Sequence, residues 1–385
     1  MIYLDYAATT PMSEEALHIY TETAKTYYGN PSSLHDIGGA AARLLEICRK
    51  ELASLLNADE KGIYFTSGGT ESNVLAIRSL IEAHRHKGNH LITTTTEHAS
   101  LYNLFQRLES EGYNVTYLPV DEFGSIDLQY LEKSITPHTI LASIHHANSE
   151  IGTIQPIRDI GQILRRHNVL FHSDCVQTFG KIHVDVEEMM IDSLSISSHK
   201  IYGPKGVGAV YIHPRIKWEP CLPNTTHENG FRPGTVNLPG ITSFVTAAQH
   251  IHANLRQEQI RLKELREQLI AFISDKQLSI AIEGHPNHVL PNIVGLRIHG
   301  IEGQYTMLEC NRYGIAISTG SACQVGKQAP SRAMIATGKK EGEAKEFVRV
   351  SLGRLTTVHD IETFVTILER ICKQFYNEKG YEVSR

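Results

Sequence analysis

Short apolar runs alternate with longer segments, in which apolar residues recur every three or four positions, through the first 212 residues. The short runs predict strands at 62–66, 90–95, 114–120, 139–146, 168–173, 193–197 and 207–212. The longer segments predict helices at 41–56, 71–86, 99–110, 127–135 and 157–167. Strands separated by helices of this length predict a largely parallel sheet that is covered by helices on both faces.

The pattern changes near residue 254, where a charge-rich helical segment is followed by a shorter region of strands and helices. This region includes a predicted strand at 347–352 and ends with a predicted helix at 359–376. The chain has 385 residues, more than one hydrophobic core usually serves, so we expect two domains. We predict a large α/β domain over residues 14–256. Residues 257–385, together with residues 1–13, are predicted to form a small C-terminal α/β domain.

Charge and composition narrow the possible partners. The net charge is −5 without a long run of one sign, which gives no support to a nucleic-acid surface. No apolar stretch reaches the roughly 18 residues of a membrane-spanning helix, and the N-terminus lacks a signal-peptide pattern. The six cysteines lie far apart without a CxxC pair, as in a reduced thiol set. We therefore expect a cytoplasmic protein without a membrane partner.

Two charged residues stand directly after predicted strands. Asp174 follows the apolar run 169–173, and Lys200 comes shortly after the run 192–196. Open α/β sheets keep their ligands at the carboxyl ends of strands. A lysine amine can form a Schiff base with an aldehyde cofactor, and an aspartate can keep a pyridine nitrogen protonated. The pair predicts a pyridoxal phosphate site; the alternative is two ordinary charges at strand ends.

The segment Thr66–Ser72 links a predicted strand to a predicted helix and contains Gly68 and Gly69. Glycines let backbone N–H groups approach a ligand closely, Thr70 offers a hydroxyl, and the helix N-terminus carries partial positive charge. The segment predicts a phosphate cradle. The alternative is a simple capped helix start, because Thr and Ser are favoured there.

Further polar side chains follow strands at the same edge of the predicted sheet. His98 can stack on a flat ring and move protons. Asn148, Ser149 and Gln177 can form hydrogen bonds with a ring oxygen. For His98, a solvated loop histidine is the alternative.

Cys323 lies in a segment of small, weakly apolar residues that also contains Lys327. We expect this segment to be mobile and exposed, which makes the thiol a candidate nucleophile; an incidental surface thiol is the alternative. Arg354 follows the strand at 347–352 and can clamp a substrate carboxylate with two hydrogen bonds; a surface ion pair is the alternative. Thr235, in a turn-rich loop, can offer a hydroxyl to a phosphate across a dimer interface.

Two other motifs carry no site. His84, His86 and His90 suggest a metal, but a helix end and a Lys-Gly turn lie among them, and we expect no metal. The glycine-rich segment 203–208 precedes a strand instead of linking a strand to a helix, so it fits neither a nucleotide fingerprint nor a P-loop.

Taken together, eight motifs resemble NifS/IscS-type cysteine desulfurases in order and spacing. They are residues 3–11, 29–33, 66–72, 96–98, 174–177, 198–206, 320–323 and 351–354. The resemblance extends from residue 2 to about residue 375. It implies an aminotransferase-like pyridoxal phosphate fold of type I, an obligate homodimer, and a long mobile catalytic loop over about 320–333.

The resemblance also implies residue roles. Cys323, Lys200 and His98 are the expected catalytic residues. The expected cofactor-binding residues are Lys200, Asp174, Gln177, His98, Gly69, Thr70, Ser197, Ser198, His199, Asn148, Ser149 and, from the partner subunit, Thr235. The expected substrate-binding residues are Arg354, Asn30 and Asn148. Ser149 departs from the family pattern, which usually has a second asparagine at this position.

The implied activity converts L-cysteine to L-alanine and leaves the sulfur as a persulfide on Cys323. The sulfur then passes to an acceptor for iron–sulfur cluster or other sulfur-cofactor assembly. The acceptor stays open between an iron–sulfur scaffold, a dedicated client enzyme and a tRNA-thiolation protein. One alternative is a selenocysteine lyase or another pyridoxal phosphate enzyme of this fold. An alternative from another class is a non-catalytic sulfur-relay partner.

Overall fold

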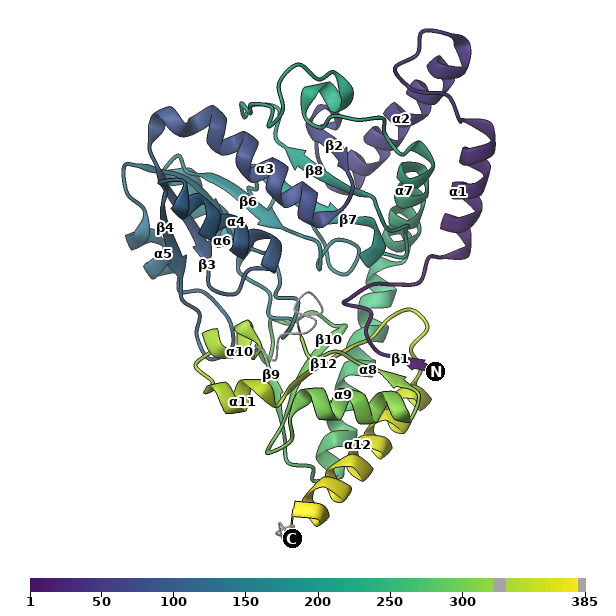
Figure 1. Ribbon diagram of the computed structural model, residues 1–385, viewed down its shortest axis with the longest axis vertical. Helices are drawn as coiled ribbons and strands as arrows, with labels where there is room; N and C mark the ends of the chain where they lie inside the picture. The colour runs from purple at the N-terminus through teal and green to yellow at the C-terminus, as the bar shows by residue number, and fades with distance from the viewer. Residues whose placement is uncertain (321–329, 380–385) are drawn as a thin grey trace.

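The computed structural model describes residues 1–320 and 330–379. A seven-stranded sheet forms the centre of the larger body (Figure 1). Its strands, in spatial order, are β2 (Ile63–Thr66), β8 (Gly208–Ile212), β7 (Ser193–Ser197), β6 (Leu170–Asp174), β5 (Thr139–Ser143), β3 (His90–Thr94) and β4 (Asn114–Leu118). Only β8 runs antiparallel to its neighbours. The predicted, largely parallel sheet is thus confirmed.

Helices cover both faces of this sheet, as the alternating pattern predicts. One buried cluster contains residues of α2, α6 and α7, and a second contains residues of α3 and α4. The helices of this body are α1 (Glu14–Thr26), α2 (Asp36–Leu55), α3 (Gly69–His84), α4 (Ala99–Ser110), α5 (Leu128–Ser134), α6 (Ile157–Arg166) and α7 (Leu238–Ala253). Short 3-10 helices lie at η1 (Glu60–Gly62), η2 (Arg85–Lys87), η3 (Ser198–Lys200) and η4 (His227–Gly230).

The smaller body lies below the larger one in Figure 1 and has its own core. Its central antiparallel sheet has the order β12-β10-β9, and β1 pairs with β11 in a second, parallel sheet. In chain order its elements are β1 (Ile2–Tyr3), α8 (Leu255–Asp275), β9 (Ile280–Glu283), β10 (Ile293–Ile298), α9 (Gly303–Arg312), β11 (Ile315–Ala316), α10 (Arg332–Ala336), α11 (Glu341–Lys345), β12 (Phe347–Ser351) and α12 (Val358–Lys379). The chain start therefore packs with its C-terminal part; the exact domain boundaries stay a prediction.

Helices α1 and α7, which pack against each other, were not predicted from the hydrophobic pattern. Ten residues of α7 are buried, among them Leu238, Ile241, Phe244 and Ala248. A helix that is apolar almost all round has no single apolar stripe, so its periodicity is weak. No helix within residues 1–320 and 330–379 is both long and apolar enough to span a membrane.

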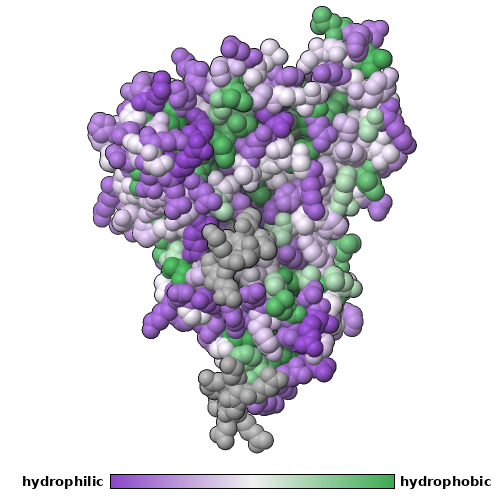
Figure 2. All heavy atoms as spheres, viewed as in Figure 1, coloured by the Kyte–Doolittle hydropathy of each residue, from purple (hydrophilic) through white to green (hydrophobic). Residues whose placement is uncertain are grey.

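Several apolar side chains of the described residues stay exposed, and some of them lie near the connection between α1 and α2. Hydrophobic side chains gather at the outer tip of the larger body, around the segment between α1 and α2 (Figure 2). Leu34 is fully exposed, Tyr28 is 70% exposed, and Ile37 is 45% exposed. Exposed apolar side chains that lie in one region are candidates for a contact surface.

Candidate active site

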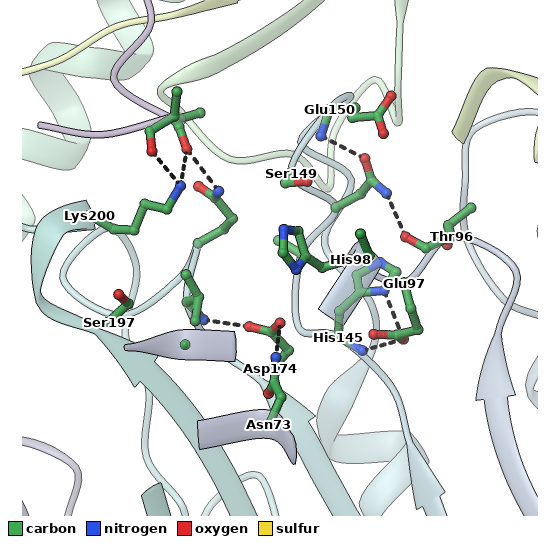
Figure 3. A pocket seen from close by; sticks show the side chains of 18 of the residues that line it. Asn73, Thr96, Glu97, His98, His145, Ser149, Glu150, Asp174, Ser197 and Lys200 are labelled. Carbon is green, nitrogen blue, oxygen red and sulfur yellow. Dashed lines mark hydrogen bonds and ion pairs between the residues drawn. The ribbon is translucent and has the colours of Figure 1, made fainter. Parts of the chain in front are cut away.

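A cavity of about 240 Å³ lies at the carboxyl-terminal edge of the seven-stranded sheet. We call it the Lys200 cavity. Most of the predicted cofactor-binding residues line it, although they come from separate loops. These residues are Gly69, Thr70, His98, Asn148, Ser149, Asp174, Gln177, Ser197, His199 and Lys200. Figure 3 shows many of them pointing into one common space.

Lys200 ends the short helix η3, directly after strand β7. Its Nζ donates hydrogen bonds to the carbonyl oxygens of Ala7 at 2.5 Å and Ala8 at 2.8 Å. The Nε2 of Gln177 donates to the same Ala7 oxygen at 3.1 Å (Figure 3). The N-terminal segment, which begins in the smaller body, thus completes one wall of the cavity.

Asp174 is the last residue of β6 and is only 7% exposed. Its Oδ2 accepts a hydrogen bond from Asn73 Nδ2 at 2.8 Å, and its Oδ1 accepts one from the Val176 N–H at 2.9 Å. Asn73 Oδ1 in turn contacts the Nε2 of His172 at 3.2 Å. The carboxylate is therefore held in one orientation at the cavity floor. Sequence reasoning missed Asn73, although it lies one helical turn beyond Gly69 in α3.

The N-terminus of α3 forms the opposite end of the cavity. Gly68 has φ +149°, which favours glycine, and no side chain caps this helix end. A Cβ at Gly69 would lie 2.7 Å from Val176 Cγ2, so the backbone comes close to the cavity wall. The Ser197 Oγ is buried there without a hydrogen-bond partner in the described chain. Open N–H groups, a hydroxyl and a helix N-terminus match the predicted phosphate cradle.

His199 lies beside this cradle. Burial, together with the neighbouring charges of Lys200 and Lys205, lowers the pKa of His199 to about 4. Its Nδ1 contacts Thr9 Oγ1 at 3.1 Å. The imidazole is therefore neutral near pH 7 and offers a hydrogen bond instead of a charge.

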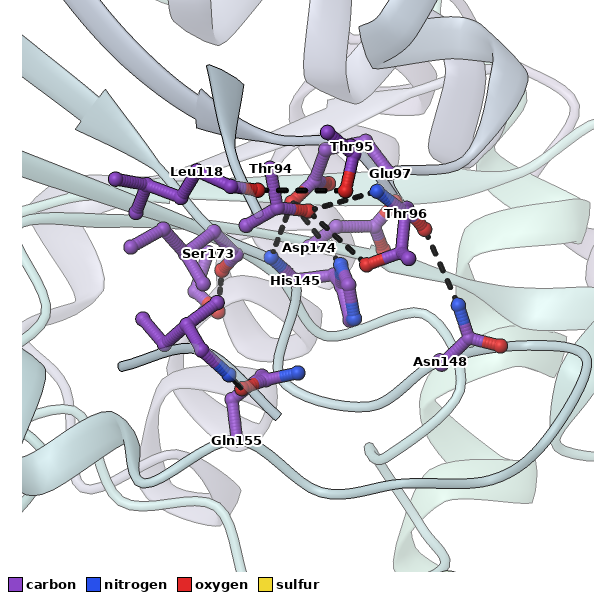
Figure 4. A network of polar contacts seen from close by, with 12 residues as sticks. Thr94, Thr95, Thr96, Glu97, Leu118, His145, Asn148, Gln155, Ser173 and Asp174 are labelled. Atoms are coloured by element: carbon purple, nitrogen blue, oxygen red, sulfur yellow. Dashed lines mark hydrogen bonds and ion pairs between the residues drawn. The ribbon is translucent and has the colours of Figure 1, made fainter. Parts of the chain in front are cut away.

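His98 caps the N-terminus of α4, and its Nδ1 contacts Ser100 Oγ at 2.8 Å. The preceding residue, Glu97, is buried in a polar network (Figure 4). Its Oε1 accepts hydrogen bonds from Thr94 Oγ1 at 3.0 Å and from the His145 N–H at 2.8 Å, and contacts His145 Nδ1 at 3.0 Å. This network fixes the loop that carries His98, and His145 itself lines the cavity. Neither Glu97 nor His145 was predicted.

Asn148 and Ser149 play different parts. The Oδ1 of Asn148 accepts from the N–H groups of Glu150 at 2.8 Å and Ile151 at 3.0 Å, and its Nδ2 donates to the Thr96 carbonyl at 3.1 Å. The Asn148 amide thus holds the turn together. Ser149 is the member of the pair whose hydroxyl is available to a ligand in the cavity.

Two arginines that are five residues apart in the sequence line different cavities. Arg349, in β12, lines the Lys200 cavity and is 3% exposed. Its Nη1 donates to the Ser149 carbonyl at 2.8 Å, its Nη2 donates to Asp5 Oδ1 at 2.8 Å, and its Nε has no partner in the described residues. Arg354, the predicted substrate ligand, lies beyond the strand and lines a separate cavity. An arginine between Val348 and Val350 in an apolar strand was the signal that could have identified Arg349.

The structure does not bring three further predicted residues to the Lys200 cavity. The Oγ of Ser198 faces Gly203, where an added Cβ would lie only 2.2 Å away. Asn30 and Thr235 are exposed in loops of the larger body. In a single chain, none of the three lines the cavity.

Cys323 lies outside the described residues. Gly320 lines the cavity, and the Oγ of Ser331 donates a hydrogen bond to Glu150 Oε2. Both described flanks of the cysteine segment therefore lie at or near the cavity. Helix α10 begins at Arg332, and the loop over about 320–333 stays a prediction.

The predicted absence of a metal at His84, His86 and His90 can be compared with the local contacts. His90 contacts Thr139 Oγ1 through Nδ1 at 2.6 Å and Thr116 Oγ1 through Nε2 at 2.9 Å. His84 contacts the Lys217 carbonyl at 3.0 Å. These histidines thus have hydrogen-bonding roles within the fold.

Comparison with known proteins places this geometry in a family. The model of the aminotransferase class-V family matches residues 2–364. The chain is 48% identical over 376 residues to "Putative cysteine desulfurase NifS" of Bacillus subtilis, covering 96% of this chain and 95% of that protein.

Solved structures with a similar fold are also found. A "NIFS-like protein" superimposes with a TM-score of 0.91 at 31% identity, covering 97% of this chain and 99% of that one. "SspA in complex with cysteine" superimposes with a TM-score of 0.80 at 34% identity, covering 91% and 99%. The chain therefore belongs to the aminotransferase class-V family, whose members depend on pyridoxal phosphate.

Proposed function

We propose that this protein is a cysteine desulfurase, which converts L-cysteine to L-alanine and passes the sulfur on through Cys323. The observation that carries the proposal is the Lys200 cavity, where a lysine, a buried aspartate, a phosphate cradle and a buried guanidinium meet. The name of the Bacillus subtilis relative and the cysteine-bound SspA structure support the same substrate.

The residues of the cavity fit pyridoxal phosphate. The N-terminus of α3 suits the phosphate group, and so does the hydroxyl of Ser197, which has no hydrogen-bond partner in the part of the chain that the structure describes. Asp174 suits a protonated pyridine nitrogen, and Lys200 can hold the aldehyde carbon. When bound, the cofactor withdraws electrons from the bonds at the substrate α-carbon.

Arg349 is the residue that we assign to the substrate carboxylate, in place of Arg354. Its guanidinium is buried in the Lys200 cavity, and hydrogen bonds to Asp5 and the Ser149 carbonyl hold its plane. The Nε of Arg349 has no partner among the described residues, and it offers the directional donor that a carboxylate needs. The Ser149 hydroxyl, beside it, can orient the same substrate.

The remaining steps use side chains for proton and sulfur transfer. The Nζ of Lys200 moves from the Ala7 and Ala8 carbonyls to take the proton from the substrate α-carbon, with His98 as the second proton carrier. The Cys323 thiolate attacks the substrate sulfur, so an S–S bond forms while the substrate Cβ–S bond breaks. The electron pair of that bond stays on Cβ, which takes up a proton, and the α-carbon regains the proton that Lys200 removed. Alanine then leaves, and Cys323 keeps the sulfur as a persulfide.

A second copy of this chain is the partner that best suits the exposed features of the larger body. The apolar tip near Leu34 lies in the same connection as Asn30, and Thr235 is exposed. A homodimer that covers this tip would bring Asn30 and Thr235 to the partner's cavity. Mass determination in solution by light scattering tests the dimer, and Leu34→Glu should produce monomers with reduced activity. The sulfur acceptor is a further protein partner whose identity stays open.

The first experiment measures alanine formed from L-cysteine, with a thiol reductant present, by the wild type, Cys323→Ala and Cys221→Ala. Cys221 is an exposed thiol outside the cavity and is therefore the matched control. We expect robust alanine from the wild type and from Cys221→Ala, and almost none from Cys323→Ala.

Equal alanine from all three proteins would contradict the role of Cys323 and would favour a lyase that acts without a protein thiol. A cofactor-loaded wild type that forms no alanine, with or without candidate acceptors, would contradict the desulfurase assignment itself.

A further inference from the structure

A second cavity of about 240 Å³ is lined by Tyr202, in the segment that carries Lys200. Its walls come from α1, α7 and α8 and from the loops that contain Lys181, Tyr202 and Arg354. Tyr202 stands only two residues after Lys200 and has φ +65°, a left-handed conformation that is uncommon outside glycine. We call this space the Tyr202 cavity.

Two cations of the Tyr202 cavity contact the same aromatic ring. The Nζ of Lys181 lies 5.0 Å from the centroid of the Tyr202 ring, and the Cζ of Arg354 lies 4.8 Å from it. Lys181 is only 7% exposed. Within residues 1–320 and 330–379, neither cation has a carboxylate within ion-pair distance. A buried ammonium group is costly without a negative partner, and an aromatic face offsets only part of that cost.

The carboxylates of this cavity face other cations. Glu258 makes a two-pronged contact with Arg261, at 2.8 Å and 2.7 Å. Glu15 lies 3.8 Å from the Nδ1 of His250. Glu258 still acts on Lys181, and Glu15 on Arg354, through space. Among the described residues, however, neither carboxylate is close enough to either cation for an ion pair, so an external anion can approach both cations more closely.

We propose that the Tyr202 cavity binds a small oxyanion, a carboxylate or a phosphate, between Lys181 and Arg354. Arg354 presents a planar fork of donors, which suits two oxygens of one ligand, and Lys181 adds a compact positive charge. An anion bound there would also contact Tyr202, whose hydroxyl accepts a hydrogen bond from the Arg354 N–H at 2.7 Å. The ligand would thus touch the segment that carries Lys200. The proposal does not depend on desulfurase activity, because the probe is bound and not turned over.

The burial of Lys181 agrees with this assignment. Burial lowers its pKa to about 8, although the more distant charge of Glu258 acts in the opposite direction. Near pH 7 the amine is still mainly protonated. An anion would make the buried charge favourable, and binding should weaken as pH rises above about 8.

The test uses protein that carries its cofactor, so that the phosphate cradle of the Lys200 cavity is already filled. Binding of inorganic phosphate and of acetate is measured by titration calorimetry at constant ionic strength, with chloride as the balancing anion. We expect saturable binding of at least one probe to one site per chain. The affinity should fall about tenfold or more in Lys181→Met and in Arg354→Leu, since each removes a charge-assisted contact.

Lys263→Met is the matched control, because Lys263 is an exposed lysine on α8, with a side chain 70% exposed, outside the cavity. It should bind like the wild type. If a neutral variant does not fold, Lys181→Arg or Arg354→Lys takes its place in the test. Each of these variants keeps the positive charge and should retain measurable binding. Binding of phosphate without binding of acetate would identify a phosphate site. Binding of acetate without binding of phosphate would identify a carboxylate site. Absence of saturable binding for both probes, or unchanged binding in both neutral variants, would overturn the proposal.

Discussion

Neighbouring residues of one short segment line the Lys200 cavity and the Tyr202 cavity, but the charged groups of the two cavities are held in different ways. In the Lys200 cavity, Asp174 accepts hydrogen bonds from Asn73 and the Val176 N–H, and Arg349 donates to Asp5. In the Tyr202 cavity, Lys181 and Arg354 lie against an aromatic ring. Directional hydrogen bonds fix atoms for chemistry, whereas contacts with a ring face leave a cation free to receive a ligand.

The partners of a charged group near an active site indicate whether that group is held for catalysis or awaits a ligand. A charged group with polar partners on several sides is positioned for a defined geometry, as catalysis requires. A buried charge without a counter-ion indicates instead that the protein alone does not complete the site.

The largest effect is expected for Lys200→Ala. This substitution removes the amine that we assign to cofactor attachment and proton transfer, so alanine formation should fall by about 10⁴-fold or more. The cofactor should also be lost more readily during gel filtration, as absorbance will report. Lys181→Met changes a lysine of the other cavity and should leave alanine formation within about twofold of the wild type. A comparable loss of alanine formation in Lys200→Ala and Lys181→Met would contradict the assignment of only the Lys200 cavity to catalysis.

The two arginines provide the next test. Arg349→Gln should raise the KM for L-cysteine by about 100-fold, because a buried charged hydrogen bond to the substrate carboxylate is lost. Arg354→Gln should change that KM by less than about threefold. Steady-state kinetics on both variants will show which arginine binds the substrate carboxylate. Circular dichroism will confirm that each variant is folded. A larger effect of Arg354→Gln would return the substrate role to the residue first predicted from sequence.

Lys181→Met should stabilise the protein at pH 7 in chloride buffer, by on the order of 1–3 kcal/mol. The pKa of Lys181 is about 8 in the folded state, against 10.5 for the free side chain. The unfolded chain therefore binds more protons between these values, so wild-type stability should rise as pH increases through this window. Urea unfolding of both proteins at pH 7 and pH 9 measures the difference, which should shrink at pH 9. A destabilised variant at pH 7 would contradict an unpaired buried charge.

The smallest effect is expected at Ser149. Ser149→Ala removes one hydroxyl from the Lys200 cavity without disturbing the turn, which the Asn148 amide holds. The kcat/KM for L-cysteine should fall by about three- to tenfold. Asn148→Ala, which breaks the turn, should lower both thermal stability and activity more strongly. Equal effects in the two variants would show that the residues share one role.

Much of the larger body followed from the sequence. Strong alternation of apolar runs and amphipathic segments identified the strands and most of the helices that build the sheet. The residues at strand ends, such as Asp174 and Lys200, were recognisable because parallel strands bring their carboxyl ends to one edge. The helix α7 was not recognisable, because a helix buried on nearly all sides loses its amphipathic period.

Local pattern alone fixed which residue types stand at the sheet edge, because period and strand ends are properties of the chain itself. Tertiary structure decided which of them share a cavity. Arg349 and Arg354 are five residues apart, yet one is in a strand facing the Lys200 cavity and the other lies in the turn beyond it. Asn73, Glu97 and His145 each contact a partner that is distant in sequence, and these contacts bring them to the cavity. A side chain's direction and its counter-charge depend on packing between distant segments, which no local pattern records.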